Sequence, residues 1–246
     1  MPVNAKEIFK VYLWSKINQI KVPCCLCGAS APASAGICDA CASAIPRLQG
    51  PLCRCALPWP GSPAAAGDDG LAPLCGRCLH QPPPFLGVQS ALIYSHPLDR
   101  LVNGWKHQGK LHLQRPLTHL WLNSLTLLPD TDLITPVPLY WQRQWQRGFN
   151  QAACLAEALA QRTGLPMQPL LRKRSRSHQQ GSSARARRSG RDLFCCKSSI
   201  EGLHILLVDD VVTTTSTVRQ ASNALLRAGA RSVSVIAPCR VLPPES

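Results

Sequence analysis

The chain has 246 residues, of which 27 are Lys or Arg and 13 are Asp or Glu, so its formal net charge is +14. This length allows one sizeable α/β core with a small appendage, and the charge favours an anionic partner such as nucleic acid, a phosphorylated small molecule or an acidic membrane surface. No segment reaches the roughly 18 consecutive apolar residues that cross a bilayer, and lysines interrupt the apolar residues of the N-terminus, which argues against a signal peptide. We therefore expect a cytoplasmic protein without a transmembrane segment.

Residues 1–23 form a basic N-terminal segment. Within it, residues 6–21 place apolar side chains along one stripe at helical spacing, which predicts an amphipathic helix. Such a helix can rest on a membrane surface, but packing on its own domain is the commoner arrangement.

Residues 24–84 are rich in cysteine, and eight of the 13 cysteines lie in four close pairs. Two such pairs supply the four thiolates of a tetrahedral zinc site, and the absence of a secretion signal argues against disulfides. The first two pairs predict a structural zinc site. The last two hold a shorter C-x-C and a long insert, so they predict either a second zinc site or a degraded one. The residues are Cys24, Cys27, Cys38, Cys41, Cys53, Cys55, Cys75 and Cys78. A redox role for the pairs is a further alternative, although the sequence places none of them at a recognisable helix N-terminus.

Residues 85–246 form the main domain. Strands are expected at 87–94 and 132–139, and a helix from Asn150, a good N-cap, to Thr163. Before that helix, Arg147 offers a guanidinium suited to phosphate, although an ordinary loop fits equally well. Lys106 can also meet a phosphate, but a solvated surface charge is the commoner role.

Residues 172–191 contain eight Lys or Arg and no Asp or Glu. This composition predicts a basic loop that closes over a pyrophosphate or follows a nucleic-acid backbone. A solvated run of charge is the alternative.

The most informative segment is 205–217. An apolar run from Ile205 to Val208 predicts a strand buried on both faces, and Asp209 and Asp210 follow at its carboxyl end, where carboxylates can bind sugar hydroxyls. Five hydroxyl residues then lead into a helix whose N-terminus can hold a phosphate. They are Thr213, Thr214, Thr215, Ser216 and Thr217. A further strand is expected at 232–237. The alternative is an ordinary strand-to-helix connection with capping side chains.

Together these motifs resemble the competence protein F (ComF/GntX) family of phosphoribosyltransferase-like proteins. The resemblance rests on motifs spread over nearly the whole chain from Cys24. They are the paired cysteines, Trp105-Lys106-His107, Pro136-Val137-Pro138-Leu139, Arg147-Gly148-Phe149-Asn150-Gln151, Arg174 with Gln179, and Val208-Asp209-Asp210-Val211-Val212-Thr213-Thr214.

The resemblance implies an α/β fold of the type I phosphoribosyltransferase kind, a parallel sheet flanked by helices, behind a double zinc ribbon that binds Zn²⁺. It also implies binding of phosphoribosyl pyrophosphate (PRPP) with Mg²⁺. Asp209 and Asp210 would take the ribose hydroxyls and the loop from Thr213 to Thr217 the 5′-phosphate. The remaining substrate contacts that it implies are Lys106, Arg147, Gln179 and Arg188.

The family is associated with the uptake and processing of transforming DNA. The resemblance leaves open whether its members transfer the phosphoribosyl group and to which acceptor. The alternative is an accessory protein that binds single-stranded DNA and other competence proteins without transferase activity. A redox or metal-handling protein is a third possibility.

The chain departs from the family pattern in its phosphate loop. The family usually has Thr-Thr-Gly-x-Thr, and Thr215 stands here in place of the glycine. A β-branched residue disfavours positive φ and crowds a phosphate. The asparagine usual before Phe194 is also absent, with Ser189 or Gly190 in its place.

Overall fold

The computed structural model describes residues 20–61, 71–125, 130–139, 148–173 and 193–243. The chain divides into two compact units. The helical unit comprises Met1–Pro46 and Ser95–Ser124, and the sheet unit comprises Arg47–Tyr94 and Leu125–Ser246. The two predicted cysteine sets therefore lie in different units. The domain boundaries expected after residues 23 and 84 remain predictions.

The helical unit joins a small cysteine-rich ribbon to a pair of helices. Its elements are β1 (Lys21–Pro23), β2 (Ser30–Pro32), α2 (Asp39–Ser43), α4 (Leu98–His107), η2 (Leu111–Leu113) and α5 (Gln114–Asn123). Strands β1 and β2 pair antiparallel, and α4 packs on η2 and α5. Trp105 of α4 and Trp121 of α5 are almost fully buried, and Arg115 donates a hydrogen bond of 2.8 Å to the Ala33 carbonyl of the ribbon. The two tryptophans are thus part of a buried apolar interior, and the Arg115 hydrogen bond connects α5 to the ribbon.

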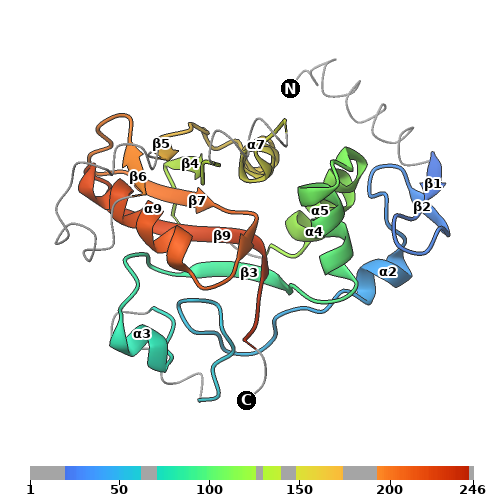
Figure 1. Cartoon of the computed structure of the whole chain (residues 1–246), viewed down its shortest axis with the longest axis horizontal. Helices are drawn as coiled ribbons and strands as arrows, with labels where there is room; N and C mark the ends of the chain where they lie inside the picture. Colours follow the sequence, from blue (N-terminus) through green and yellow to red (C-terminus); the bar gives the residue numbers. More distant parts are fainter. Residues whose placement is uncertain (1–19, 62–70, 126–129, 140–147, 174–192, 244–246) are drawn as a thin grey trace, which may run out of the picture. The chain divides into compact units, whose positions relative to one another are not determined.

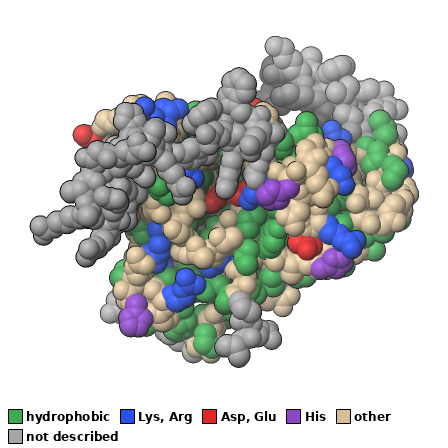
Figure 2. All heavy atoms as spheres, in the orientation of Figure 1, with side chains coloured by type: hydrophobic (Ala, Val, Ile, Leu, Met, Phe, Trp, Pro, Cys, Tyr) green, Lys and Arg blue, Asp and Glu red, His purple; other side chains and the backbone are tan. Residues whose placement is uncertain are grey.

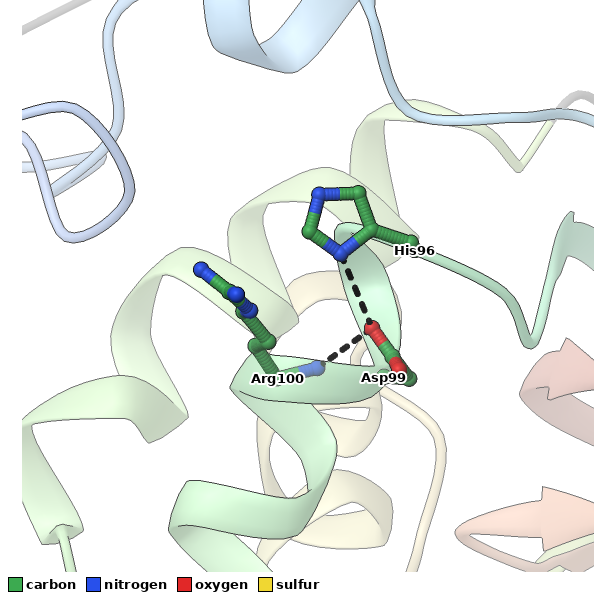
Figure 3. A network of polar contacts seen from close by, with 3 residues as sticks. All are labelled: His96, Asp99 and Arg100. Atoms are coloured by element: carbon green, nitrogen blue, oxygen red, sulfur yellow. Dashed lines mark hydrogen bonds and ion pairs between the residues drawn. The ribbon is translucent and has the colours of Figure 1, made fainter.

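A small polar network lies at the start of α4 (Figure 3). Asp99 Oδ1 accepts the backbone N–H of Arg100 at 2.8 Å and lies 3.8 Å from His96 Nδ1. A carboxylate in the first turn interacts favourably with the helix dipole. The His96 side chain is 67% exposed, so the ion pair itself contributes little.

The sheet unit is built on parallel strands (Figure 1). Neighbouring strands run in the order β3 (Val88–Ile93), β9 (Ser232–Arg240), β7 (His204–Val208) and β4 (Leu133–Pro136). Each neighbouring pair is parallel, and the short β8 (Val211–Val212) pairs with the far end of β9. Because all carboxyl ends meet at one edge, the residues that follow β4 and β7 lie along the same edge of the sheet.

The central strand β7 is buried on both faces. Ile205 and Leu207 belong to the apolar cluster that includes Val218 and Leu225 of α9. Leu206 alternates with them and therefore points to the opposite face, where it is also fully buried. The continuous apolar run thus has the burial that its sequence predicted.

Two longer helices pack on the sheet, and one of them also contacts a separate antiparallel strand pair. Helix α7 (Gln151–Thr163) packs on β4 and β7, while α9 (Ser216–Arg227) packs on β7, β9 and the antiparallel pair β5 (Leu171–Lys173) and β6 (Phe194–Cys196). Asn150 caps α7 by accepting the Ala152 N–H at 3.1 Å, and Gly164 ends it in the left-handed conformation. The predicted N-cap at Asn150 and the predicted helix end at Thr163 are both confirmed.

The predicted fold class is confirmed: a parallel sheet flanked by helices, together with cysteine groups able to form a zinc-binding module. Across the described residues, no helix combines the length and the apolar character that a membrane crossing requires.

Candidate phosphate loop and metal centres

The acidic pair follows the carboxyl end of β7. Asp209 is only 9% exposed, and its backbone N–H donates to the Ile236 carbonyl of β9 at 3.0 Å. Its Oδ1 accepts the Asp210 N–H at 2.9 Å. Asp209 is therefore held rigidly by the sheet, while Asp210 is more exposed. A rigid carboxylate at this edge is suited to bind vicinal hydroxyls of a sugar.

The residues between β8 and α9 present donors. Among the described residues, no hydrogen-bond acceptor is found for the backbone N–H groups of Thr213, Thr214 and Thr215. Helix α9 begins directly afterwards at Ser216 and has no side-chain cap. Successive free N–H groups at a helix N-terminus form a favourable site for an anion such as phosphate.

Thr215 occupies the left-handed conformation, with φ of 65°. Glycine, which is usual at this position in the family that the chain resembles, adopts such a positive φ without a steric penalty. The threonine hydroxyl is internally bonded: Oγ1 donates to the Thr214 carbonyl at 2.6 Å and accepts Arg219 Nε at 3.2 Å. These two contacts offset part of the conformational strain.

The loop borders a cavity of about 570 Å³. Thr214, Thr215 and Ser216 line one part of it, and Cys55 and Cys78 line another. Three arginines, Arg77, Arg219 and Arg240, also line it, and no carboxylate does among the described residues. Figure 2 shows Lys and Arg side chains (blue) at the lower left of this face, where Figure 1 places α3 (Gly76–His80) and the start of α9.

The second cysteine set lies in the sheet unit next to this cavity. The Sγ atoms of Cys53, Cys55, Cys75 and Cys78 all lie within 4.8 Å of one another. The distance from Cys55 Sγ is 3.5 Å to Cys53 Sγ and 3.8 Å to Cys75 Sγ, and the Cys75 N–H donates to Cys53 Sγ at 3.1 Å. The C-x-C spacing thus still converges with the C-x-x-C pair.

The first cysteine set has the same arrangement in the helical unit. The Sγ atoms of Cys24, Cys27, Cys38 and Cys41 also lie within 4.8 Å of one another, and Cys27 Sγ lies 3.7 Å from Cys38 Sγ. Burial raises the pKa of Cys24, but the backbone N–H groups of Cys27, Cys38 and Leu26 outweigh it and bring the pKa to about 6. Hydrogen bonding to Cys27, followed by burial, raises the pKa of Cys41.

Both sets fit a tetrahedral zinc ion. A Zn–S bond of about 2.3 Å places the sulfurs of a tetrahedron about 3.8 Å apart. The Cys27–Cys38 and Cys55–Cys75 separations match this value closely, at 3.7 and 3.8 Å. Four thiols so close together cannot all ionise without a cation between them. For the second set, the sulfur positions therefore favour an intact zinc site over a degraded one.

Two arginines that were not predicted as functional residues from the sequence join the second cysteine set to the loop. Arg240 ends β9 and is 2% exposed, and Arg219 lies in the first turn of α9. The spacing of Arg219 could have predicted its contact with Thr215, because residues four positions apart are neighbours on the surface of a helix. Arg240 carried only the weak signal of a charge at the end of an apolar strand.

The structure does not test the other predicted substrate contacts. Lys106 lies on α4 in the helical unit. Arg147, Gln179 and Arg188 lie outside the described residues, as does most of the basic loop at 172–191 and most of the N-terminal helix expected at 6–21. Their roles remain predictions.

Comparison with known proteins gives a family. Residues 150–243 match the family profile described as "Phosphoribosyl transferase domain". The DNA utilization protein YhgH of Salmonella typhi is 39% identical over 217 residues, which cover 84% of this chain and 91% of that protein. Competence protein F of Haemophilus influenzae is 32% identical over 173 residues, which cover 65% of this chain and 76% of that protein. The chain belongs to the competence protein F family.

The range matched by the family profile contains the candidate site. In this chain Asp209, Asp210 and the hydroxyl residues 213–217 all lie within the residues that match the phosphoribosyl transferase profile. Among solved structures, one titled "Structure of the allosteric regulatory enzyme of purine biosynthesis" is 24% identical with a TM-score of 0.37, covering 49% of this chain and 24% of that one. The chain is thus a competence-related protein of the phosphoribosyltransferase type.

Proposed function

We propose that the sheet unit binds PRPP, with Asp209 and Asp210 on the ribose hydroxyls and residues 213–217 around the 5′-phosphate. The observation that carries this proposal is the run of N–H groups at Thr213, Thr214 and Thr215 that have no acceptor in the described part of the chain, directly before a helix without a side-chain cap. The rigid Asp209 carboxylate a few residues earlier supplies acceptors for hydroxyls. Phosphate donors and sugar acceptors are therefore close together in the sequence and lie at one edge of the sheet.

The pyrophosphate end of PRPP needs further positive charge. We propose that Mg²⁺ accompanies PRPP, because a divalent cation neutralises pyrophosphate oxygens and favours their departure. Lys106, Arg147, Gln179 and Arg188 are proposed as additional contacts. If transfer occurs, the bond from the anomeric carbon to pyrophosphate breaks and a bond to an acceptor forms. The acceptor is left open by the residues described.

We also propose that each cysteine set binds one structural zinc ion. Its support is the convergence of the sulfur atoms to separations suited to tetrahedral zinc. Two zinc sites of this kind would need eight reduced cysteines, and we propose a cytoplasmic location because that compartment keeps thiols reduced.

Calorimetric titration of PRPP with Mg²⁺ against the purified protein tests the ligand. We expect saturable binding that the Asp209→Asn variant weakens by about tenfold or more, because a hydrogen bond to a charged group contributes about 1.5–3 kcal/mol. Asp132→Asn is a matched control, since Asp132 accepts the His204 N–H at the opposite end of β7. Equal affinity in all three proteins would refute the assignment of Asp209.

A second candidate function is the binding of single-stranded DNA in natural transformation. The net charge of +14 favours it, and relatives carry the names DNA utilization protein and competence protein. Electrostatic binding of this kind weakens steeply as salt rises. Restoration of transformation in a deletion strain by Asp209→Ala would separate DNA handling from the ribose site, whereas failure to restore it would tie the two together.

A further inference from the structure

The second cysteine cluster is joined to the loop at residues 213–217 by the hydrogen bonds of two arginines. Arg240 supplies the first connection. Its Nε donates to the Cys55 carbonyl at 2.8 Å, and its Nη1 donates to the Val212 carbonyl at 3.0 Å and to the Thr213 carbonyl. One guanidinium therefore holds both a residue of the cluster and the first residue of the loop.

Arg219 supplies the second connection. Its Nε donates to Thr215 Oγ1 at 3.2 Å, and its Nη2 lies 4.0 Å from Cys78 Sγ and donates to the Gln81 carbonyl at 2.6 Å. Cys55 belongs to the C-x-C pair and Cys78 to the C-x-x-C pair. Each half of the cluster is thus tied to the loop by its own arginine.

The charge of Arg240 needs a partner that the hydrogen bonds do not supply. Its acceptors among the described residues are all backbone carbonyls, and the side chain is 2% exposed. A buried charge without a counter-charge is strongly unfavourable. If the cluster held zinc on its four thiolates, its net charge would be negative, and because Arg240 bonds the Cys55 carbonyl, that charge would stabilise the buried guanidinium.

The same guanidinium orients the donors of the loop. In a trans peptide the C=O and N–H groups point in opposite directions. Holding the Val212 and Thr213 carbonyls on Arg240 therefore turns the N–H groups of Thr213 and Thr214 away from it. These are N–H groups that the proposed phosphate would use.

We propose that Arg240 and Arg219 are positioning residues that couple metal binding at Cys53, Cys55, Cys75 and Cys78 to phosphate binding at the loop. This inference rests on the proposed function, because it requires that the loop binds phosphate. By linkage, a metal that favours the ligand-ready loop is itself held more tightly when the ligand is bound.

Metal release measured with and without ribose 5-phosphate tests the coupling. A chromogenic chelator follows zinc leaving the full-length protein, and the phase lost in Cys55→Ser identifies the second cluster. We expect saturating ribose 5-phosphate to slow that phase by about fivefold or more, within the usual range of coupling between sites. The phase from Cys24, Cys27, Cys38 and Cys41 should not respond.

Conservative variants assign the coupling to the arginines. Arg240→Lys keeps the charge but cannot span Cys55 and Thr213, and Arg219→Lys tests the other connection at a more exposed position. Both are expected to abolish the slowing and to weaken ribose 5-phosphate binding. Arg231→Lys, a substitution at an exposed position before β9, is the matched control and should keep both properties.

The outcomes are distinguishable. If ribose 5-phosphate binds and neither metal phase responds, the coupling is wrong and the proposed function stands. If both arginine variants keep the slowing, the arginines are not the connection and the inference is refuted. If ribose 5-phosphate does not bind the wild-type protein, the proposed phosphate loop is wrong and the coupling falls with it.

Discussion

Substitution of Thr215 tests the loop conformation, because the left-handed backbone there determines whether the glycine or the alanine variant is the more stable. At most positions outside the left-handed region, alanine is more stable than glycine, because glycine loses more backbone freedom on folding by about 0.4–1 kcal/mol. Thr215 has φ of 65°, where an L-residue with a Cβ carries a penalty of about 1–2 kcal/mol. Thr215→Gly removes that penalty and Thr215→Ala retains it. We therefore predict that the glycine variant is the more stable of the two, by about 0.5–1 kcal/mol.

The stability of each variant relative to wild type also depends on the side-chain contacts that are lost. Both variants lose the hydroxyl that donates to Thr214 and accepts from Arg219, and both lose a methyl group from a side chain that is 7% exposed. Together these losses amount to about 1–2 kcal/mol. The alanine variant should therefore be less stable than wild type by about that amount, whereas the glycine variant should lie within about 1 kcal/mol of wild type.

Urea unfolding at fixed zinc concentration measures both differences, provided that the slope against urea is the same for all three proteins. A change in slope would indicate that the two units unfold separately. Greater stability of Thr215→Ala than of Thr215→Gly would refute the claim that the loop holds a strained conformation at this position.

Further substitutions test the metal centre, the ligand site and the helix cap. Cys55→Ser should lower the zinc content by one equivalent per chain, measured by elemental analysis, and an unchanged content would contradict the second site. Asp209→Asn should weaken ribose 5-phosphate binding by about tenfold or more in calorimetry, since it removes a charged acceptor; equal affinity would exclude Asp209 as a contact. Asn150→Ala removes the acceptor for Ala152 N–H and the donor to Val137 O, and should cost about 1–2 kcal/mol of stability in urea unfolding; no loss would show that the cap is not needed.

The sequence predicted the parts of the fold in which local pattern and tertiary packing agree. The strand at Ile205–Val208 is buried on both faces because its apolar run leaves no polar face to expose. Helix α7 begins after Asn150 and ends at Gly164, where side-chain capping and positive φ are local properties. The first cysteine set converges as its spacing predicted, and the second set, for which the sequence left a degraded site open, converges as well.

Long-range contacts were not readable in this way. Cys55 and Arg240 are 185 positions apart, and only the folded sheet brings them together. Helices α4 and α5 were not predicted, because Lys106 was considered as a phosphate contact and the apolar spacing of Leu101, Val102 and Trp105, which are buried, was not used. The short strand pair β5 and β6 flanks a long basic segment, so neither strand was recognisable alone.

The structure also indicates that less of the net positive charge is available to bind nucleic acid than the sequence suggests. Each cluster, if it holds zinc on four thiolates, contributes two net negative charges, so two clusters reduce the formal net charge from +14 to +10. Arg240 and Arg219 donate hydrogen bonds to backbone carbonyls, to the Thr215 hydroxyl and to the Cys78 sulfur inside the sheet unit. They cannot serve a nucleic acid without breaking the connection between cluster and loop. Attraction of DNA must therefore depend on other cations, of which residues 172–191 supply the largest group without any acid. Substitutions within 172–191 should consequently change the salt dependence of DNA binding, while Arg240→Lys should leave it unchanged.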